Sequence, residues 1–127
     1  MFEEYTPDLA AYFDAWSKQV VLTKKRDTIQ LRLAELTAKI YIDCMNYEKY
    51  YIRGKPPSVA FVDKTWGKIG HTPEAIEEMS RIKNELIEVD AELNYTKAVM
   101  KAEEMKLNLF QTMSANARNI AGFNDYE

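Results

Sequence analysis

The sequence predicts an all-α protein in which two long helices, joined by a connector, assemble into a higher homo-oligomer. Apart from Pro7 and Gly122, every proline and glycine lies between Gly54 and Pro73, so the interval on either side runs more than forty residues without a helix breaker. Both intervals repeat apolar residues in steps of three and four, and both open with the same helix-start signal. The single domain divides into a helix region at residues 7–53, a 19-residue connector at residues 54–72 and a helix region at residues 73–121.

The two helix starts are the tripeptides Thr6-Pro7-Asp8 and Thr72-Pro73-Glu74. In each, the threonine hydroxyl can accept a hydrogen bond from an unpaired backbone N–H, and proline suits the first helical position. The acid is favourable at the positive end of the helix dipole. We therefore predict that Thr6 and Thr72 are N-caps.

The first helix region carries an apolar seam that predicts packing against another helix. The seam consists of Leu22, Ile29, Leu33, Leu36, Ile40, Tyr47 and Tyr50, with Tyr12, Trp16 and Val20 as a related stripe upstream. Lys24-Lys25-Arg26 interrupts the apolar run, and Asp27 followed by Gln30 has the spacing of a capping box. A kink or short loop at residues 23–28 is therefore an alternative to one continuous helix. We expect this region to end near Arg53, with Gly54 as a left-handed cap.

The second helix region is apolar on two faces. The first face is formed by Met79, Ile82, Leu86, Val89, Leu93, Met100, Leu107 and Phe110, with Thr96 and Glu103 as polar interruptions; the second is formed by Tyr95, Ala98, Ala102, Met105, Leu109 and Met113. At 100° per residue the two faces are roughly opposite, and one partner helix covers only one of them. We therefore predict a homo-oligomer. The predicted oligomerisation residues are Leu93, Met100, Met105, Leu107, Leu109, Phe110 and Met113.

The connector is too apolar for a plain linker, because it contains Val59, Phe61, Val62, Trp66 and Ile69. Loops of this length are usually functional or disordered. We expect this one to be ordered against the helix ends, with residues 59–62 as a short extended segment.

Charge is distributed unevenly along the chain. Residues 18–68 hold 11 Lys/Arg and 5 Asp/Glu, a net charge of +6, whereas residues 1–17 carry −4 and residues 69–127 carry −5. A basic middle between acidic ends suggests one surface for polyanions and another for partners. The alternative is that a long helix simply carries a solvated charged face.

Residues that could carry catalysis are scarce. Cys44 and His71 are the only residues of their types, so no zinc cluster is expected, and Cys44 lies on the apolar face and is predicted to be buried. No phosphate-binding loop motif is present. We expect no enzyme activity, no cofactor and no metal. The acidic first residues and the lack of a long apolar run indicate neither a signal peptide nor a membrane span, so we expect a cytoplasmic protein.

Binding to single-stranded nucleic acid has more support in the sequence. Basic groups can neutralise phosphates while aromatic faces stack on bases, and the middle of the chain mixes both types. The predicted site residues are Lys24, Lys25, Arg26, Arg32, Lys39, Lys49, Tyr50, Tyr51, Arg53, Lys55, Lys64, Trp66 and Lys68. Tyrosines at helical spacing are also typical of a core, and this interpretation competes for Tyr50.

Two segments resemble the UvsY family of phage recombination mediators. The end of the first half, Tyr47-Glu48-Lys49-Tyr50-Tyr51-Ile52-Arg53-Gly54-Lys55, is similar to the family's aromatic pair followed by glycine. The Asp90-Ala91-Glu92-Leu93 segment, Val99, Glu103 and Leu107, and the ending Ile120-Ala121-Gly122-Phe123, are similar in spacing to its C-terminal helix. The family places basic residues before its aromatic pair, whereas here Arg53 and Lys55 follow it.

The resemblance implies a ring-forming helical protein that binds single-stranded DNA and loads a RecA-like recombinase against competition from single-strand binding protein, in the cytoplasm of an infected host. It implies no catalytic turnover and an assembly that depends on the C-terminal helix. The alternative function is a coiled-coil interaction module, an adaptor or inhibitor, that binds no nucleic acid. A structural component of a virion or filament is a third hypothesis.

Overall fold

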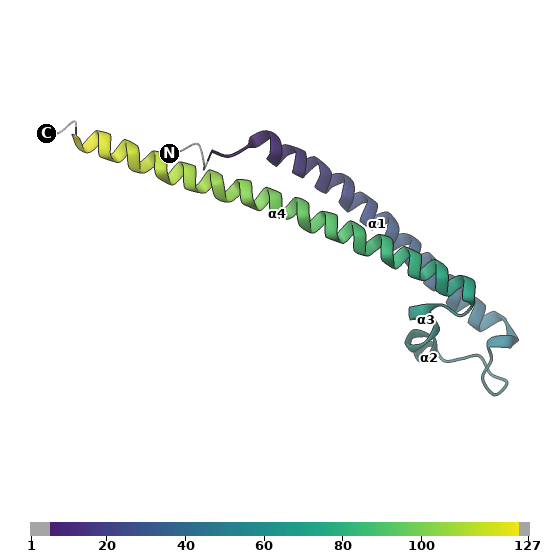
Figure 1. The fold of residues 1–127 in the computed structure, drawn as a ribbon. Coiled ribbons are helices and arrows are strands. Elements are labelled where there is room, and N and C mark those ends of the chain that lie inside the picture. Colours follow the sequence, from purple (N-terminus) through teal and green to yellow (C-terminus); the bar gives the residue numbers. More distant parts are fainter. Residues whose placement is uncertain (1–5, 125–127) are drawn as a thin grey trace. The chain divides into compact units, whose positions relative to one another are not determined.

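A computed structural model describes residues 6–124 of the chain, with side chains described for residues 6–119. Its elements are α1 (Leu9–Asn46), the short 3-10 helix η2 (Glu48–Tyr50), α2 (Val59–Lys64), α3 (Trp66–Ile69) and α4 (Pro73–Asn124), shown in Figure 1. The described residues contain no strand, and α1 and α4 pack against each other, so the predicted all-α fold class of two long helices is confirmed. None of the described helices is both long enough and apolar enough to cross a membrane.

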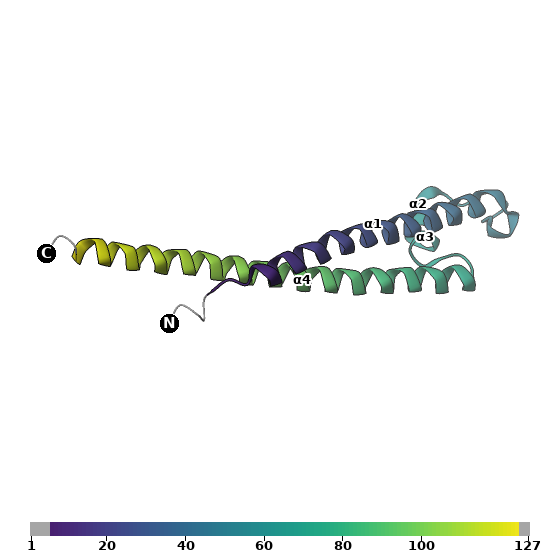
Figure 2. The same ribbon diagram turned by 90° about the horizontal axis from the view of Figure 1, so that it is seen from above.

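The chain forms two compact units, and α1 and α4 contribute to both. Unit 1 consists of Met1–Leu22 and Glu92–Glu127, and unit 2 consists of Thr23–Ala91. In unit 2, α2 and α3 lie beside the end of α1 and the start of α4 (Figures 1 and 2). The two long helices run antiparallel. In unit 2, Arg26 pairs with Asp90 and the later Arg32 pairs with the earlier Glu85.

Most of the predicted heptad seam forms the core of each unit, but Leu107, predicted on the same face of α4, is exposed. In unit 2 the buried side chains are Ile29, Leu36, Ile40 and Cys44 of α1 and Ala75, Met79, Ile82 and Val89 of α4; in unit 1 they are Ala15, Leu93, Thr96 and Glu103. The steps of three and four continue across both helices, as coiled-coil packing requires. Thr96 and Glu103, predicted as polar interruptions, are buried, and the Thr96 hydroxyl donates to the Leu93 carbonyl oxygen at 2.8 Å.

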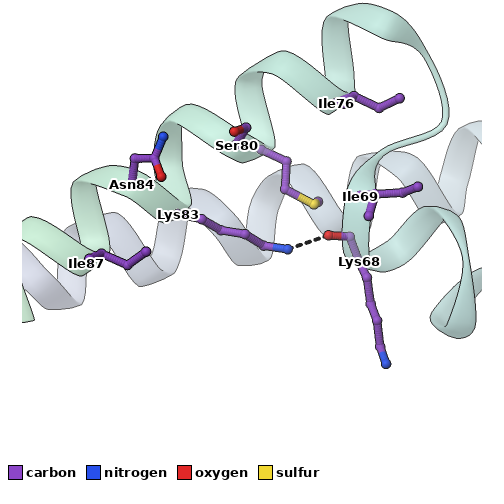
Figure 3. A pocket seen from close by; sticks show the side chains of 8 residues that line it. Lys68, Ile69, Ile76, Ser80, Lys83, Asn84 and Ile87 are labelled. Atoms are coloured by element: carbon purple, nitrogen blue, oxygen red, sulfur yellow. Dashed lines mark hydrogen bonds between the residues drawn. The ribbon is translucent and has the colours of Figure 1, made fainter.

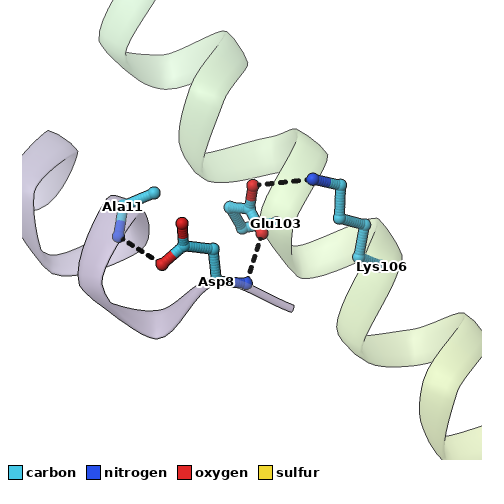
Figure 4. Close-up of polar contacts among 4 residues, drawn as sticks. All are labelled: Asp8, Ala11, Glu103 and Lys106. Atoms are coloured by element: carbon cyan, nitrogen blue, oxygen red, sulfur yellow. Dashed lines mark hydrogen bonds and ion pairs between the residues drawn. The ribbon is translucent and has the colours of Figure 1, made fainter. Parts of the chain in front are cut away.

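One of the two predicted N-caps is confirmed and the other is wrong. Thr72 caps α4, since its hydroxyl accepts the Ala75 N–H at 3.1 Å. The cap of α1 is Asp8 rather than Thr6: its carboxylate accepts the Ala11 N–H at 3.0 Å. The cap lies at Asp8 because of a contact with α4. Glu103 of α4 accepts the backbone N–H of Asp8 at 2.7 Å, and this hydrogen bond fixes the start of α1 at Asp8 (Figure 4).

The helix α1 is unbroken through residues 23–28, so the short loop kept as an alternative is absent. Arg26 takes a seam position there, and its guanidinium reaches Asp90 of α4 at 2.7 Å. The stripe predicted upstream of the seam, at Tyr12, Trp16 and Val20, is partly wrong. Trp16 and Val20 are exposed, and the seam continues from the predicted Leu22 to Ala15, which keeps the heptad register of Ile29.

The end of α1 was predicted at Arg53 but lies at Asn46. Tyr47 is extended, with φ −107° and ψ 122°, so it leaves the helix and its ring is exposed. Gly54 does not cap α1; it lies in a tight turn further on. The connector therefore covers residues 47–72 and is called so below.

The connector is ordered, as expected, but the extended segment predicted at residues 59–62 is helical. The Ser58 hydroxyl accepts a hydrogen bond from the Phe61 N–H at 3.1 Å, so Ser58 is the N-cap of α2. Val62 of α2 is fully buried. Gly70 then allows the return into α4, because its φ is +97° and a Cβ there would lie 2.6 Å from the backbone nitrogen of Ile76.

Candidate nucleic-acid interface

All of the predicted nucleic-acid-binding residues belong to unit 2. They divide into three groups by their surroundings. Arg26 and Arg32 face α4, whereas Lys24, Lys25 and Lys39 are exposed on α1. The remainder belong to the connector.

Two of the predicted nucleic-acid-binding residues already form ion pairs within the chain. Arg26 forms an ion pair with Asp90, and Arg32 places Nη1 2.9 Å from Glu85 Oε2. Each pair links α1 to α4 at about half exposure. Because these guanidinium groups are neutralised by α4, they are poorly placed to bind phosphate.

The other basic side chains of the predicted site form no ion pair within residues 6–124. They are Lys24, Lys25, Lys39, Lys49, Arg53, Lys55, Lys64 and Lys68. Each of them is exposed. Unpaired exposed ammonium and guanidinium groups keep their full charge for a polyanion.

Arg53 and Lys55 are presented by a two-residue turn. Ile52 and Lys55 exchange both backbone hydrogen bonds, at 2.8 and 3.1 Å, and the residues between them have positive φ, 55° for Arg53 and 77° for Gly54. Two successive left-handed residues are the requirement of a type I′ turn. The turn holds the two basic side chains on an exposed corner of the connector.

Aromatic rings of the connector form a continuous cluster. Phe61 and Trp66 meet edge to face with centroids 5.4 Å apart, and Trp66 meets Tyr50 at 5.6 Å. Tyr50 also packs on His71 at 4.8 Å. The ammonium of Lys49 lies 5.0 Å from the Tyr50 centroid, so a cation lies directly beside the cluster.

The cluster borders a polar cavity of about 290 Å³ where the end of α1 meets the start of α4. His71 is almost completely buried beside it, with Nε2 3.1 Å from Asp43 Oδ2 and with Nδ1 making no hydrogen bond in the described structure. Asp43 and Tyr47, which also line this cavity, were not among the predicted nucleic-acid-binding residues. Only the folded connector brings them next to Lys39 and Lys49.

Two tyrosines of this region serve the fold. The Tyr51 hydroxyl donates to the Met45 carbonyl at 3.2 Å, which ties the connector back to α1. Tyr41 donates to Asp63 of α2, and this hydrogen bond, together with desolvation and the charge of Asp63, raises the Tyr41 pKa to about 12. Tyr51 is therefore half-buried support rather than an open stacking surface.

Lys68 borders an apolar groove of about 440 Å³ between α3 and α4. Ile69, Ile76 and Ile87 line it, and the ammonium of Lys83 donates to the Lys68 carbonyl at the end of α3 (Figure 3). The Lys68 side chain itself points away from this contact (Figure 3). Lys83 thus satisfies a free carbonyl of α3, and the Lys68 ammonium stays available.

The described residues hold no group of three or more His, Cys, Asp or Glu side chains that could bind a metal ion. Cys44 is buried, and burial together with the neighbouring Asp43 charge raises the pKa of its thiol. Comparisons of the chain with protein-family models, with curated proteins and with solved structures found no match.

Proposed function

We propose that this chain is a non-enzymatic mediator that binds single-stranded DNA as a homo-oligomer and promotes loading of a RecA-like recombinase. The observation that carries the DNA-binding part is the group of unpaired basic side chains on the connector, the segment that also carries the aromatic cluster. Lys49, Arg53, Lys55, Lys64 and Lys68 supply phosphate contacts, and Trp66 and Tyr50 offer aromatic rings on which bases stack. The recombinase and single-strand binding protein are proposed as partners from the resemblance to recombination mediators.

Exposed apolar side chains support the oligomeric part. Within unit 1, Tyr95, Met105 and Leu109 of α4 are 72%, 56% and 47% exposed. Leu93, another predicted oligomerisation residue, is buried in the seam with α1 and contributes to the subunit core.

Fluorescence anisotropy with a labelled oligonucleotide tests DNA binding. The logarithm of the affinity for DNA should fall linearly with the logarithm of the salt concentration. Each lost phosphate contact should lower the magnitude of this slope by about 0.7. The Lys49→Glu/Lys55→Glu variant should bind at least tenfold more weakly. Lys97→Glu in unit 1, an equally exposed lysine, is the matched control and should bind like the unmodified chain.

Absence of binding at low salt would reject this function. The rival function, a coiled-coil interaction module, predicts that outcome together with binding to a protein. A strand-exchange assay with recombinase and single-strand binding protein separates a mediator from a simple DNA binder. Only a mediator shortens the lag before the recombinase acts.

A further inference from the structure

The first turns of α1 carry a second apolar stripe that the chain leaves uncovered. Leu9, Phe13, Trp16 and Val20 follow steps of four, three and four residues, and their exposed fractions lie between 52% and 59%. At 100° per residue, this stripe is centred about 110° from the seam that contains Ala15, so it lies to the side of the contact with α4. Only at its start do Leu9 and Phe13 border a pocket that Leu107 of α4 also lines. Four large apolar side chains in one row on a surface indicate an interface.

Within the same unit, α4 exposes a complementary stripe. Tyr95 is 72% exposed and Met105 56%, and the exposed Ala98 and Ala102 lie between them. This stripe is centred about 150° from the α4 seam. The two uncovered stripes thus belong to different helices and face different directions in unit 1.

We propose that the α1 stripe of one copy packs on the α4 stripe of the next copy. This interface rests on the homo-oligomeric part of the proposed function and specifies the surfaces that form it. The argument for a second copy as the occupant is complementarity in size and register. One stripe offers two bulky aromatic rings in its middle, and the other offers two alanines.

The register follows from contacts inside unit 1. Asp8 bonds to Glu103 and the Tyr12 hydroxyl donates to Glu104 at 3.3 Å, which places the first turn of α1 beside residues 103–104 of α4. A second copy placed beside the first at the same level repeats that alignment between copies. Phe13 then lies opposite Ala102 and Trp16 opposite Ala98, while Leu9 lies opposite Met105 and Val20 opposite Tyr95. Aromatic rings fit where alanine leaves space, as in tightly packed helix pairs.

The proposed interface is heterologous, because it joins two different patches. Each copy therefore contacts two neighbours, and such contacts generate a closed ring when the rotation between copies closes. An isologous dimer would instead make the α1–α4 contact twice across a single interface, which would require both stripes on one face of the subunit.

Disulfide cross-linking between copies tests this pairing without DNA. Phe13→Cys protein and Ala102→Cys protein are prepared separately, mixed and oxidised. Each variant alone should stay uncross-linked, while the mixture should give a disulfide-linked pair. Cys44 does not compete, since it is fully buried. Self-cross-linking of Phe13→Cys alone, or no cross-link in the mixture, would overturn the heterologous interface.

A second measurement uses light scattering. Trp16→Glu should lower the mass of the assembly to that of smaller species, with the far-ultraviolet circular dichroism unchanged because Trp16 is exposed. Ile42→Glu, an exposed apolar position of α1 in unit 2, is the matched control and should leave the mass unchanged. Full-sized assemblies of Trp16→Glu would contradict the interface. This result is independent of DNA affinity, so loss of DNA binding with intact cross-linking rejects only the proposed DNA-binding function.

Discussion

The carboxylate of Glu103 accepts the backbone N–H of Asp8 with Oε2 2.7 Å from the nitrogen (Figure 4). Asp8 in turn caps α1, so a side chain of α4 determines where the other helix begins. Lys106 lies 3.0 Å from the second carboxylate oxygen and compensates its charge. A buried acid at a seam position is thereby fully paired, which is the condition for placing a charge in a helix interface.

This relationship predicts acid sensitivity. The Asp8 N–H, followed by the hydrogen bond from Lys106, lowers the pKa of Glu103 below its usual value. A carboxyl group with a lowered folded-state pKa stabilises the fold above its unfolded pKa of about 4.3, and the stabilisation is lost as pH falls through the folded value. Thermal melts should therefore show a falling Tm below about pH 4.3, and Glu103→Gln should flatten that part of the profile. Glu92→Gln, an exposed acid of α4 in unit 1, should leave it unchanged.

Gly70 should tolerate no side chain. Gly70→Ala would place a Cβ against the Ile76 nitrogen and the Ala75 carbonyl carbon at a φ of +97°. We expect a loss of about 2 kcal/mol or more in the free energy of unfolding, measured by urea denaturation. Gly54→Ala is the control, because a Cβ there meets nothing within 4 Å and only its φ of +77° is unfavourable. A loss of about 1 kcal/mol is expected for it.

Arg26 occupies a seam position that apolar residues fill elsewhere, and its ion pair with Asp90 is half-exposed. Such pairs contribute about 0–1 kcal/mol, whereas burying a leucine side chain gives about 1.5–3 kcal/mol when complete. Arg26→Leu should thus leave the chain equally stable or more stable in urea denaturation. Clear destabilisation would mean that the ion pair, rather than the heptad seam, holds the helices at this level.

Tyr41 should ionise unusually late. Its pKa is raised to about 12, first by the hydrogen bond to Asp63 and then by desolvation. Stabilisation from this group is complete below its unfolded pKa of about 10 and disappears as pH rises through the folded value. Ultraviolet titration should show one tyrosine that ionises after the others, and Asp63→Ala should remove that late step. Tyr95→Phe, at an exposed tyrosine, should leave the late step in place.

Trp66 offers a direct test of the connector as the DNA site. In a Trp16→Phe background it is the remaining tryptophan, and its ring contacts Tyr50 and Phe61. Single-stranded DNA should change its fluorescence at the same concentrations that change anisotropy, because bases would stack beside the cluster. Binding without any change in Trp66 emission would place the DNA elsewhere on the chain, for example along Lys24 and Lys25.

The sequence by itself determined the all-α fold class, both long helices and the α4 seam, because helix breakers and heptad spacing are local signals that do not depend on partners. It also determined the Thr72 cap for the same reason. Tertiary structure decided where α1 starts and ends: Glu103 moves the cap to Asp8, and Tyr51 bonds back to Met45 after the helix has stopped. It likewise decided that Ala15, and not Trp16 or Val20, is buried in the seam, and that Arg26 takes a seam position among apolar residues. The place of Arg26 depends on Asp90 of the opposite helix, and no spacing rule within α1 contains this information.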